Sequence, residues 1–219
     1  GAFSAGIFHL MTHAFFKGLL FLGAGSVMHA LSGELDMRKM GALRKKIPYT
    51  FWTFFIATLA IAGIPGLSGF FSKDEILWQA FSSSNGHFLL WLVAAMAAGM
   101  TAFYMFRALV MTFFGESRVD HHVAHHIHES PKIMTVPLMV LAVLSVIGGY
   151  IGVPHVLGGA NHIHEFLAPV LGGGGEPVKA HAGISIFSQA WASGGEGGGH
   201  GAALELFMMV VSVVIALIG

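Results

Sequence analysis

The sequence predicts an all-α fold, a polytopic bundle of transmembrane helices in which one helix is discontinuous. Hydrophobic residues make up 55% of the 219 residues and charged residues only 10%, whereas a soluble domain carries about 25% charged residues. The polar residues are also segregated, because long apolar runs alternate with short basic or Gly/His-rich stretches. This alternation is typical of proteins that cross a bilayer. A large soluble helical core would need polar faces on its outer helices, and the sequence does not provide them.

Five apolar segments account for most of the chain. About twenty residues at 1.5 Å rise each are enough to cross the hydrocarbon. The chain starts inside one apolar run and stops inside another, so we expect a fragment truncated at both ends. The expected helices are about 3–31, 49–82, 88–114 and 133–153, followed by the start of a further span at 203–219.

The 49–82 segment is too long for one straight helix and is expected to break near its middle. Pro65 removes a backbone donor, and the glycines around it lower helix propensity further. A break at membrane depth persists only where protein or a wet cavity satisfies the freed backbone groups, and such helices often mark ion sites. A packing kink is the plainer alternative. The predicted helix-break residues are Gly63, Pro65, Gly66 and Gly69.

Basic residues in the short loops predict the orientation. The 32–48 loop holds Arg38, Lys39, Arg44, Lys45 and Lys46, and the 115–132 loop holds Arg118 and Lys132. We expect both loops to be cytoplasmic. The 154–202 stretch, rich in Gly and His, is expected to be an outer (periplasmic) loop, in which 161–171 suits a short interfacial helix.

The first span carries a stripe of ionisable residues. His9, His13 and Lys17 are spaced i, i+4 and i+8, which places them along one side of a helix. Ionisable groups at bilayer depth are costly and usually face a bundle interior or a water path. The stripe therefore predicts a proton relay through intervening waters, with a satisfied buried histidine or a snorkelling lysine as the alternative. Thr12 is a minor candidate, more typical of helix packing.

A second polar cluster follows the helix break. Lys73, with Asp74 and Glu75 beside it, is expected to carry protons. The pattern of Ser72 followed by two acids also predicts that Ser72 caps the second half-helix. The alternative is an interfacial helix start that conducts nothing. Arg107, in the third span, is expected either to snorkel or to pair with an inner carboxylate.

The stretch HHVAHHIHE at 121–129 resembles a metal clamp, because histidines at i and i+4 suit zinc. Nothing fixes a geometry around them, so we expect a solvated polar loop and no metal site. Zero formal net charge gives no reason to expect a nucleic-acid partner, and the absence of cysteine excludes disulfides and Cys-ligated clusters. No dinucleotide fingerprint or phosphate loop appears.

Four stretches resemble one known family. They are HLMTHAFFKGLLFL at 9–22, KMGALRKKIP at 39–48, GIPGLSGFFSKDEIL at 63–77 and HESPKIMTVPLMVLA at 128–142. With them, the chain up to about residue 153 is similar to the subunit L family, the largest antiporter-like subunits of respiratory complex I, the proton-pumping NADH:quinone oxidoreductase. The resemblance is loose across 154–202.

The resemblance implies the second half of an inverted-repeat antiporter-like fold in a bacterial inner membrane. His9, His13 and Lys17 match the motif that links two half-channels, and Lys73 with Asp74 matches the broken-helix pair of the second one. It implies a proton-translocating subunit of an oxidoreductase with no redox centre or cofactor of its own, driven by quinone reduction elsewhere. The implied partners are other complex I membrane subunits, above all the adjacent antiporter-like subunit.

Alternative functions stay open at this point. The related large subunit of a multisubunit Na⁺/H⁺ antiporter shares the His/Lys motif, although the HESPK loop favours complex I. A structural scaffold with vestigial polar residues predicts instead that Lys17 and Lys73 tolerate neutral replacement. A metal-sensing loop at 115–132 is the weakest option.

Overall fold

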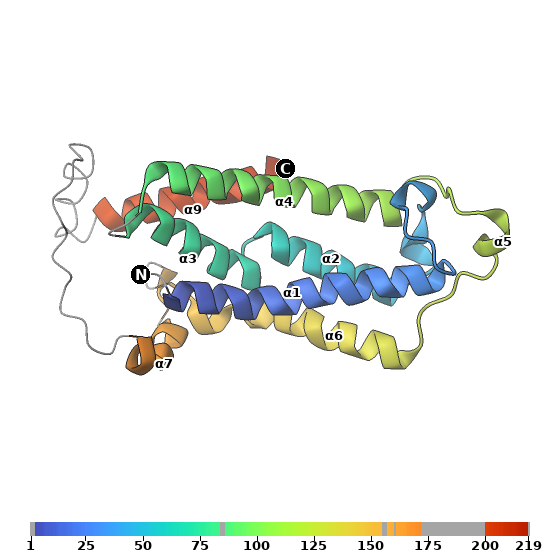
Figure 1. Ribbon diagram of the computed structural model, residues 1–219, viewed down its shortest axis with the longest axis horizontal. Coiled ribbons are helices and arrows are strands. Elements are labelled where there is room, and N and C mark those ends of the chain that lie inside the picture. Colours follow the sequence, from blue (N-terminus) through green and yellow to red (C-terminus); the bar gives the residue numbers. More distant parts are fainter. Residues whose placement is uncertain (1–2, 84–85, 155–156, 160, 172–199, 219) are drawn as a thin grey trace.

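The computed structural model describes residues 3–83, 86–154, 157–159, 161–171 and 200–218, and this part of the chain is all-helical. The long helices run roughly alongside one another in an elongated bundle (Figure 1). The helices are α1 Phe3–Ala30, α2 Pro48–Ala62, α3 Ser68–Ser82, α4 Phe88–Phe113, α5 His121–Ala124, α6 Lys132–Ile147, α7 His162–Leu171 and α9 His200–Ile218, with short 3₁₀ turns η1 Met37–Lys39, η2 Leu43–Lys45 and η3 Tyr150–Gly152.

Three stretches are long and apolar enough to cross a membrane, namely Phe3–Ala30, Phe88–Phe113 and Lys132–Gly152. Helices α2 and α3, of 15 residues each, are too short to do so alone. They follow one another along the bundle, so that together they match the length of a full span (Figure 1). The predicted polytopic bundle with one discontinuous helix is therefore confirmed.

Helix α1 lies at the centre of the packing, against α2, α3 and α6, whereas α9 packs on α4 (Figure 1). Buried residues such as Phe16, Leu19 and Leu138 fill the space between these helices. The outer faces are apolar as well: Phe21 is 78% exposed and Ile133 is 83% exposed. An exposed apolar surface of this extent suits lipid rather than water.

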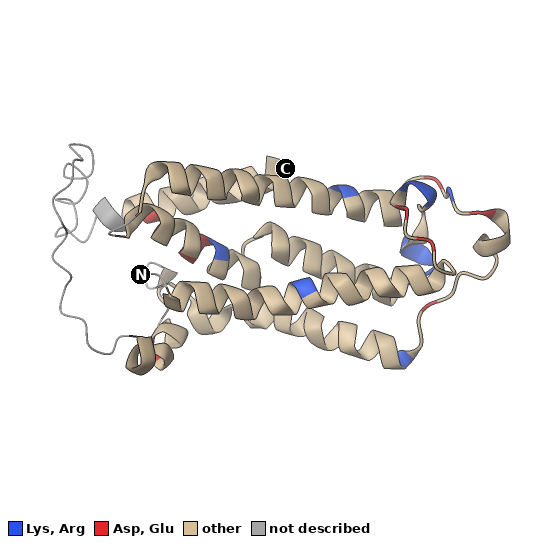
Figure 2. Ribbon diagram, viewed as in Figure 1, with Lys and Arg blue, Asp and Glu red and all other residues tan. Residues whose placement is uncertain are grey.

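The basic loops and most of the charged residues gather at one end of the bundle (Figure 2). There Arg38 pairs with Asp36 at 2.8 Å and Lys39 with Glu34 at 3.1 Å. The hydrogen bonds from Arg38 lower the pKa of Asp36 to about 2. The 32–48 and 115–132 loops together hold seven Lys and Arg against five Asp and Glu, so this end carries an excess of positive charge. A cytoplasmic position for this end stays a prediction.

A buried hydroxyl cluster joins α1, α2 and the start of α6 at this same end. The Ser26 hydroxyl lies 2.7 Å from that of Thr50 and 2.6 Å from that of Ser130. The Glu129 carboxylate accepts bonds from the Thr50 hydroxyl at 2.6 Å and from the Tyr49 backbone N–H at 2.7 Å. Glu129 thereby caps the N-terminus of α2, where an anion is favourable.

The two predicted loops differ in how far the structure describes them. The histidines at 121–129 lie in and after the short helix α5, and no three His, Asp or Glu side chains of the described residues converge as a metal site. Most of the predicted outer loop, 172–199, lies outside the described residues. Its 161–171 stretch contains α7, where a short helix was expected.

Candidate functional site

Glycines shape the interruption between α2 and α3. Helix α2 ends at Ala62, and Gly63 follows with φ of 87° as a left-handed C-cap. Gly66 has the same φ of 87°. L-residues rarely adopt this conformation, whereas glycine does so without steric cost. Pro65 lies between these two turns, and α3 begins at Ser68.

Gly69, predicted as part of the helix break, lies inside α3 instead, where it lets the two half-helices approach each other closely. A Cβ atom at this position would overlap the carbonyl oxygen of Ala60 and lie 3.4 Å from the Phe16 ring. Gly69 is therefore needed for close packing of α3 against the end of α2, rather than for an unusual backbone conformation.

Lys73 reaches back from α3 to the end of α2. Its Nζ donates to the carbonyl oxygen of Ile61 at 2.7 Å and lies 3.4 Å from that of Ala62. These carbonyls belong to the last turn of α2, which has no further helical partners for them. The C-terminal end of a helix carries partial negative charge, so it stabilises a cation placed there. Lys73 is thus hydrogen-bonded to the end of α2, where the helix interruption begins.

The ionisable stripe of α1 contacts α3 through the hydroxyl groups of Thr12 and Ser72. The Thr12 hydroxyl donates to Ser72 Oγ at 2.7 Å, and His9 Nδ1 lies 3.2 Å from the same oxygen. Ser72 lies four residues inside α3, whose N-cap is Leu67. The prediction that Ser72 caps this helix was wrong, because the helix already begins at Ser68. Ser72 connects α3 to His9 and Thr12 instead.

The ionisable stripe turns gradually away from α3. The His9 and His13 rings are 5.7 Å apart and both are half-buried, whereas Lys17 is exposed in this chain. A four-residue step rotates by about 40° around a helix of 3.6 residues per turn, so Lys17 lies further around α1 from α3 than His9 does.

These ionisable groups share an open groove of about 310 Å³ between α1, α3 and α4. Its lining carries four cationic or imidazole side chains, and most of the remainder is apolar. Thr101 and Tyr104 contribute hydroxyl groups from α4, the side opposite the stripe. The groove thus brings together His9, His13, Lys17 and Lys73, which come from both sequence clusters.

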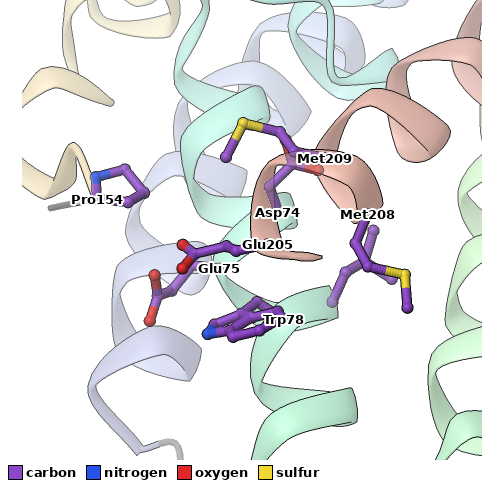
Figure 3. A pocket seen from close by; sticks show the side chains of 8 residues that line it. Asp74, Glu75, Trp78, Pro154, Glu205, Met208 and Met209 are labelled. Carbon is purple, nitrogen blue, oxygen red and sulfur yellow. The ribbon is translucent and has the colours of Figure 1, made fainter. Parts of the chain in front are cut away.

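Asp74, although adjacent to Lys73 in sequence, contacts a different helix. Its Oδ1 lies 2.5 Å from the hydroxyl of Ser212 on α9. Asp74 and Glu75 line a small cavity together with Glu205, also from α9 (Figure 3). Sequence reasoning missed Ser212 and Glu205, both of which lie in the apolar span at 203–219. Glu205, an acid inside such a span, was the available signal.

Arg107 stands apart from this arrangement. It is exposed on α4, and it forms no ion pair with any residue that the structure describes. Pairing with an inner carboxylate is therefore not seen in this part of the chain, and snorkelling stays a prediction.

The chain is similar in sequence to known membrane proteins. Residues 1–101 match the family described as NADH:quinone oxidoreductase/Mrp antiporter, TM. The chain is 52% identical over 162 residues to NADH-quinone oxidoreductase subunit L of Rhodobacter capsulatus, a match that covers 69% of this chain and 22% of the relative. It is 49% identical over 180 residues to NAD(P)H-quinone oxidoreductase chain 5 of a Picosynechococcus species, covering 70% and 27%.

Both matches thus span less than a third of each relative's length. Among solved structures, the Mrp complex from a Dietzia species is similar with a TM-score of 0.60 and 23% identity, over 98% of this chain and 21% of that one. This likeness confirms the antiporter-like arrangement of the helices. That the chain is the second of two inverted repeats stays a prediction.

Proposed function

Since this chain belongs to the transmembrane family of NADH:quinone oxidoreductases and Mrp antiporters, we propose that it is a proton-translocating part of a membrane subunit of NADH:quinone oxidoreductase. The observation that carries the proposal is the position of Lys73. Its ammonium group bridges a helix interruption and lines the groove shared with His9 and His13. The groove offers a place for water between groups that can exchange protons.

The interruption makes the charge on Lys73 sensitive to helix position. The carbonyls of Ile61 and Ala62 stabilise the ammonium form, whereas the apolar surroundings oppose it. A small shift of α2 relative to α3 changes this balance and so moves a proton on or off Nζ. In the proposal, such shifts are driven by quinone reduction elsewhere, and this chain supplies proton-carrying groups rather than a redox centre.

The proposed partners are the neighbouring membrane subunits of such a complex, above all an adjacent antiporter-like subunit, together with the lipid bilayer. Lys17 supports this, because an exposed cation at this depth in the first span needs a polar neighbour. The location proposed is a bacterial inner membrane, with loops 32–48 and 115–132 cytoplasmic according to their positive charge.

The test uses the parent complex, meaning the complete NADH:quinone oxidoreductase that contains this chain, in inverted membrane vesicles. NADH-driven proton uptake of the Lys73→Ala variant is measured alongside NADH oxidation. We expect proton uptake to fall clearly while subunit content stays normal. Lys132→Ala is the matched control, since Lys132 is exposed at the start of α6 and should leave uptake unchanged. Wild-type uptake and oxidation in an assembled Lys73→Ala complex would sink the proposal.

A second candidate is a subunit of a multisubunit Na⁺/H⁺ antiporter. The family that matches residues 1–101 includes Mrp antiporters as well as oxidoreductases, and the fold likeness to the Mrp complex is compatible with this candidate. The same vesicles distinguish the two candidates. Proton movement that follows an imposed Na⁺ gradient without NADH supports the antiporter, whereas strict dependence on NADH supports the oxidoreductase.

A further inference from the structure

A small cavity lies between α3 and α9, bordered by Asp74, the residue that follows Lys73. Its volume is about 10 Å³, close to the room that a single water molecule needs. Three carboxyl groups line it, namely those of Asp74, Glu75 and Glu205, beside Trp78 and two methionines (Figure 3). A polar cavity of one-water size among carboxyl groups is suited to passing a proton.

Asp74 leaves one oxygen available at this cavity. The residue is only 7% exposed, and its Oδ1 is held by the Ser212 hydroxyl. Its Oδ2 is buried and has no hydrogen-bond partner among the described residues. Buried polar atoms normally have a partner, from protein or from ordered water. The orphaned oxygen therefore indicates a water molecule in the cavity or a proton on the carboxyl group.

Glu75 and Glu205 bring two acids from different helices to the same place. Their side chains lie close together and point in the same direction in Figure 3. The amide of Gln79 donates to Glu75 Oε1 at 3.1 Å, and Glu205 is half-buried on α9. Two carboxylates at one cavity repel each other, and a shared proton removes that repulsion.

We propose that Glu205 and Glu75 form the proton acceptor that follows Asp74, linked to it by one water molecule in this cavity. Resting on the proposed function, this makes Glu205 a further proton-path residue at the end of the bundle where α9 begins. The protonated Asp74 carboxyl gives its proton to the water, and the water gives one to the Glu75–Glu205 pair. Asp74 becomes a carboxylate, the pair gains one proton, and the water is unchanged.

The test uses the parent complex in inverted vesicles with Glu205→Gln, Glu205→Asp and Glu165→Gln. The last is the matched control, because Glu165 is exposed on α7. The part of NADH-driven proton uptake that Lys73→Ala removes defines the share carried by this chain. We expect Glu205→Gln to remove most of that share, Glu205→Asp to keep more of it, and Glu165→Gln to leave it intact.

Infrared difference spectra recorded on changing pH give a second readout that does not depend on pumping. A proton shared by the pair predicts one protonated-carboxyl band that disappears in Glu205→Gln and equally in Glu75→Gln. A band that Na⁺ removes from the wild type at constant pH would show a cation site and overturn the proton proposal.

The outcomes separate the two proposals. Suppose that Lys73→Ala lowers proton uptake, but an assembled Glu205→Gln complex shows wild-type uptake and an unchanged carboxyl band. This result overturns the proposed role of Glu205 and leaves the proposed function standing. If Lys73→Ala has no effect, the proposed function fails. The carboxyl band then still decides whether the pair shares a proton.

Discussion

Lys73 Nζ lies 2.7 Å from the carbonyl oxygen of Ile61, so a cation on α3 is hydrogen-bonded to the last turn of α2. The two residues are separated by the glycine turns of the helix interruption. The contact therefore couples the geometry of the break to the charge state of a group in the groove. A break that only relieved packing would not need a cation at this point.

Replacing Lys73 by Met should loosen the interruption locally. The Ile61 and Ala62 carbonyls would lose their donor, and an unmet buried acceptor costs about 1–3 kcal/mol. Hydrogen–deuterium exchange of the backbone around residues 61–67 should accelerate by roughly tenfold or more, because exchange reports local opening. Lys17→Met is the control, since Lys17 is exposed. Equal exchange in both variants would mean that Lys73 does not stabilise the break.

The break itself was predictable from sequence, because its causes are local. Pro65 lacks the backbone donor that would continue α2, and Gly63 and Gly66 lower helix propensity at the same place. The stripe of His9 and His13 was predictable for the same reason, since helical spacing alone places them on one side. What Lys73 contacts was not predictable, because the acceptors belong to another helix whose orientation only the fold determines.

Ser72→Ala should weaken the connection between His9 and α3. The Ser72 hydroxyl accepts a bond from Thr12 at 2.7 Å and lies 3.2 Å from His9 Nδ1, so its loss frees the His9 ring to rotate. We expect assembled complexes with reduced NADH-driven proton uptake. Ser145→Ala is the control, because its buried hydroxyl donates only to the Leu141 carbonyl of its own helix.

A double variant sharpens this prediction. Thr12→Val removes the donor of the hydrogen bond from Thr12 to Ser72. Proton uptake in the double variant Thr12→Val with Ser72→Ala should therefore be scarcely lower than in either single variant. Effects that simply add would mean that the two hydroxyls act separately.

The acidic side of the site was the less predictable half. Asp74 was assigned from sequence as the neighbour of Lys73, yet its carboxyl group bonds to Ser212, 138 residues further along the chain. Consecutive residues in a helix point about 100° apart, so neighbours in sequence commonly serve different surfaces. No local pattern indicated that α9 would supply Ser212 and Glu205 to this place, because that depends on long-range packing.

Glu129→Ala should release the start of α6 from α2. The carboxylate accepts two backbone N–H groups of α2 and the Thr50 hydroxyl, and losing such a cap costs about 1–3 kcal/mol. Trypsin cleavage after Lys132 in inverted vesicles should become roughly tenfold faster or more, because cleavage follows the population of the opened form. Glu116→Ala, in the exposed part of the same loop, should leave the rate unchanged.

Gly69→Ala tests whether close packing at the interruption is required. The added methyl would overlap the Ala60 carbonyl oxygen and press on Phe16, so α3 must move away from α2. Overpacking of this kind costs about 1–3 kcal/mol, and the movement would draw Lys73 away from Ile61. We expect less subunit in the membrane and, in what assembles, reduced NADH-driven proton uptake.

Gly25→Ala is the matched control for this variant. Gly25 also lies within a helix, but a Cβ there meets nothing within 4 Å, and alanine is favoured over glycine in a helix by about 1 kcal/mol. This variant should assemble and pump like the wild type. Normal assembly and uptake in Gly69→Ala would show that the two half-helices can separate without loss, and that the Lys73 contact is not what links the break to proton movement.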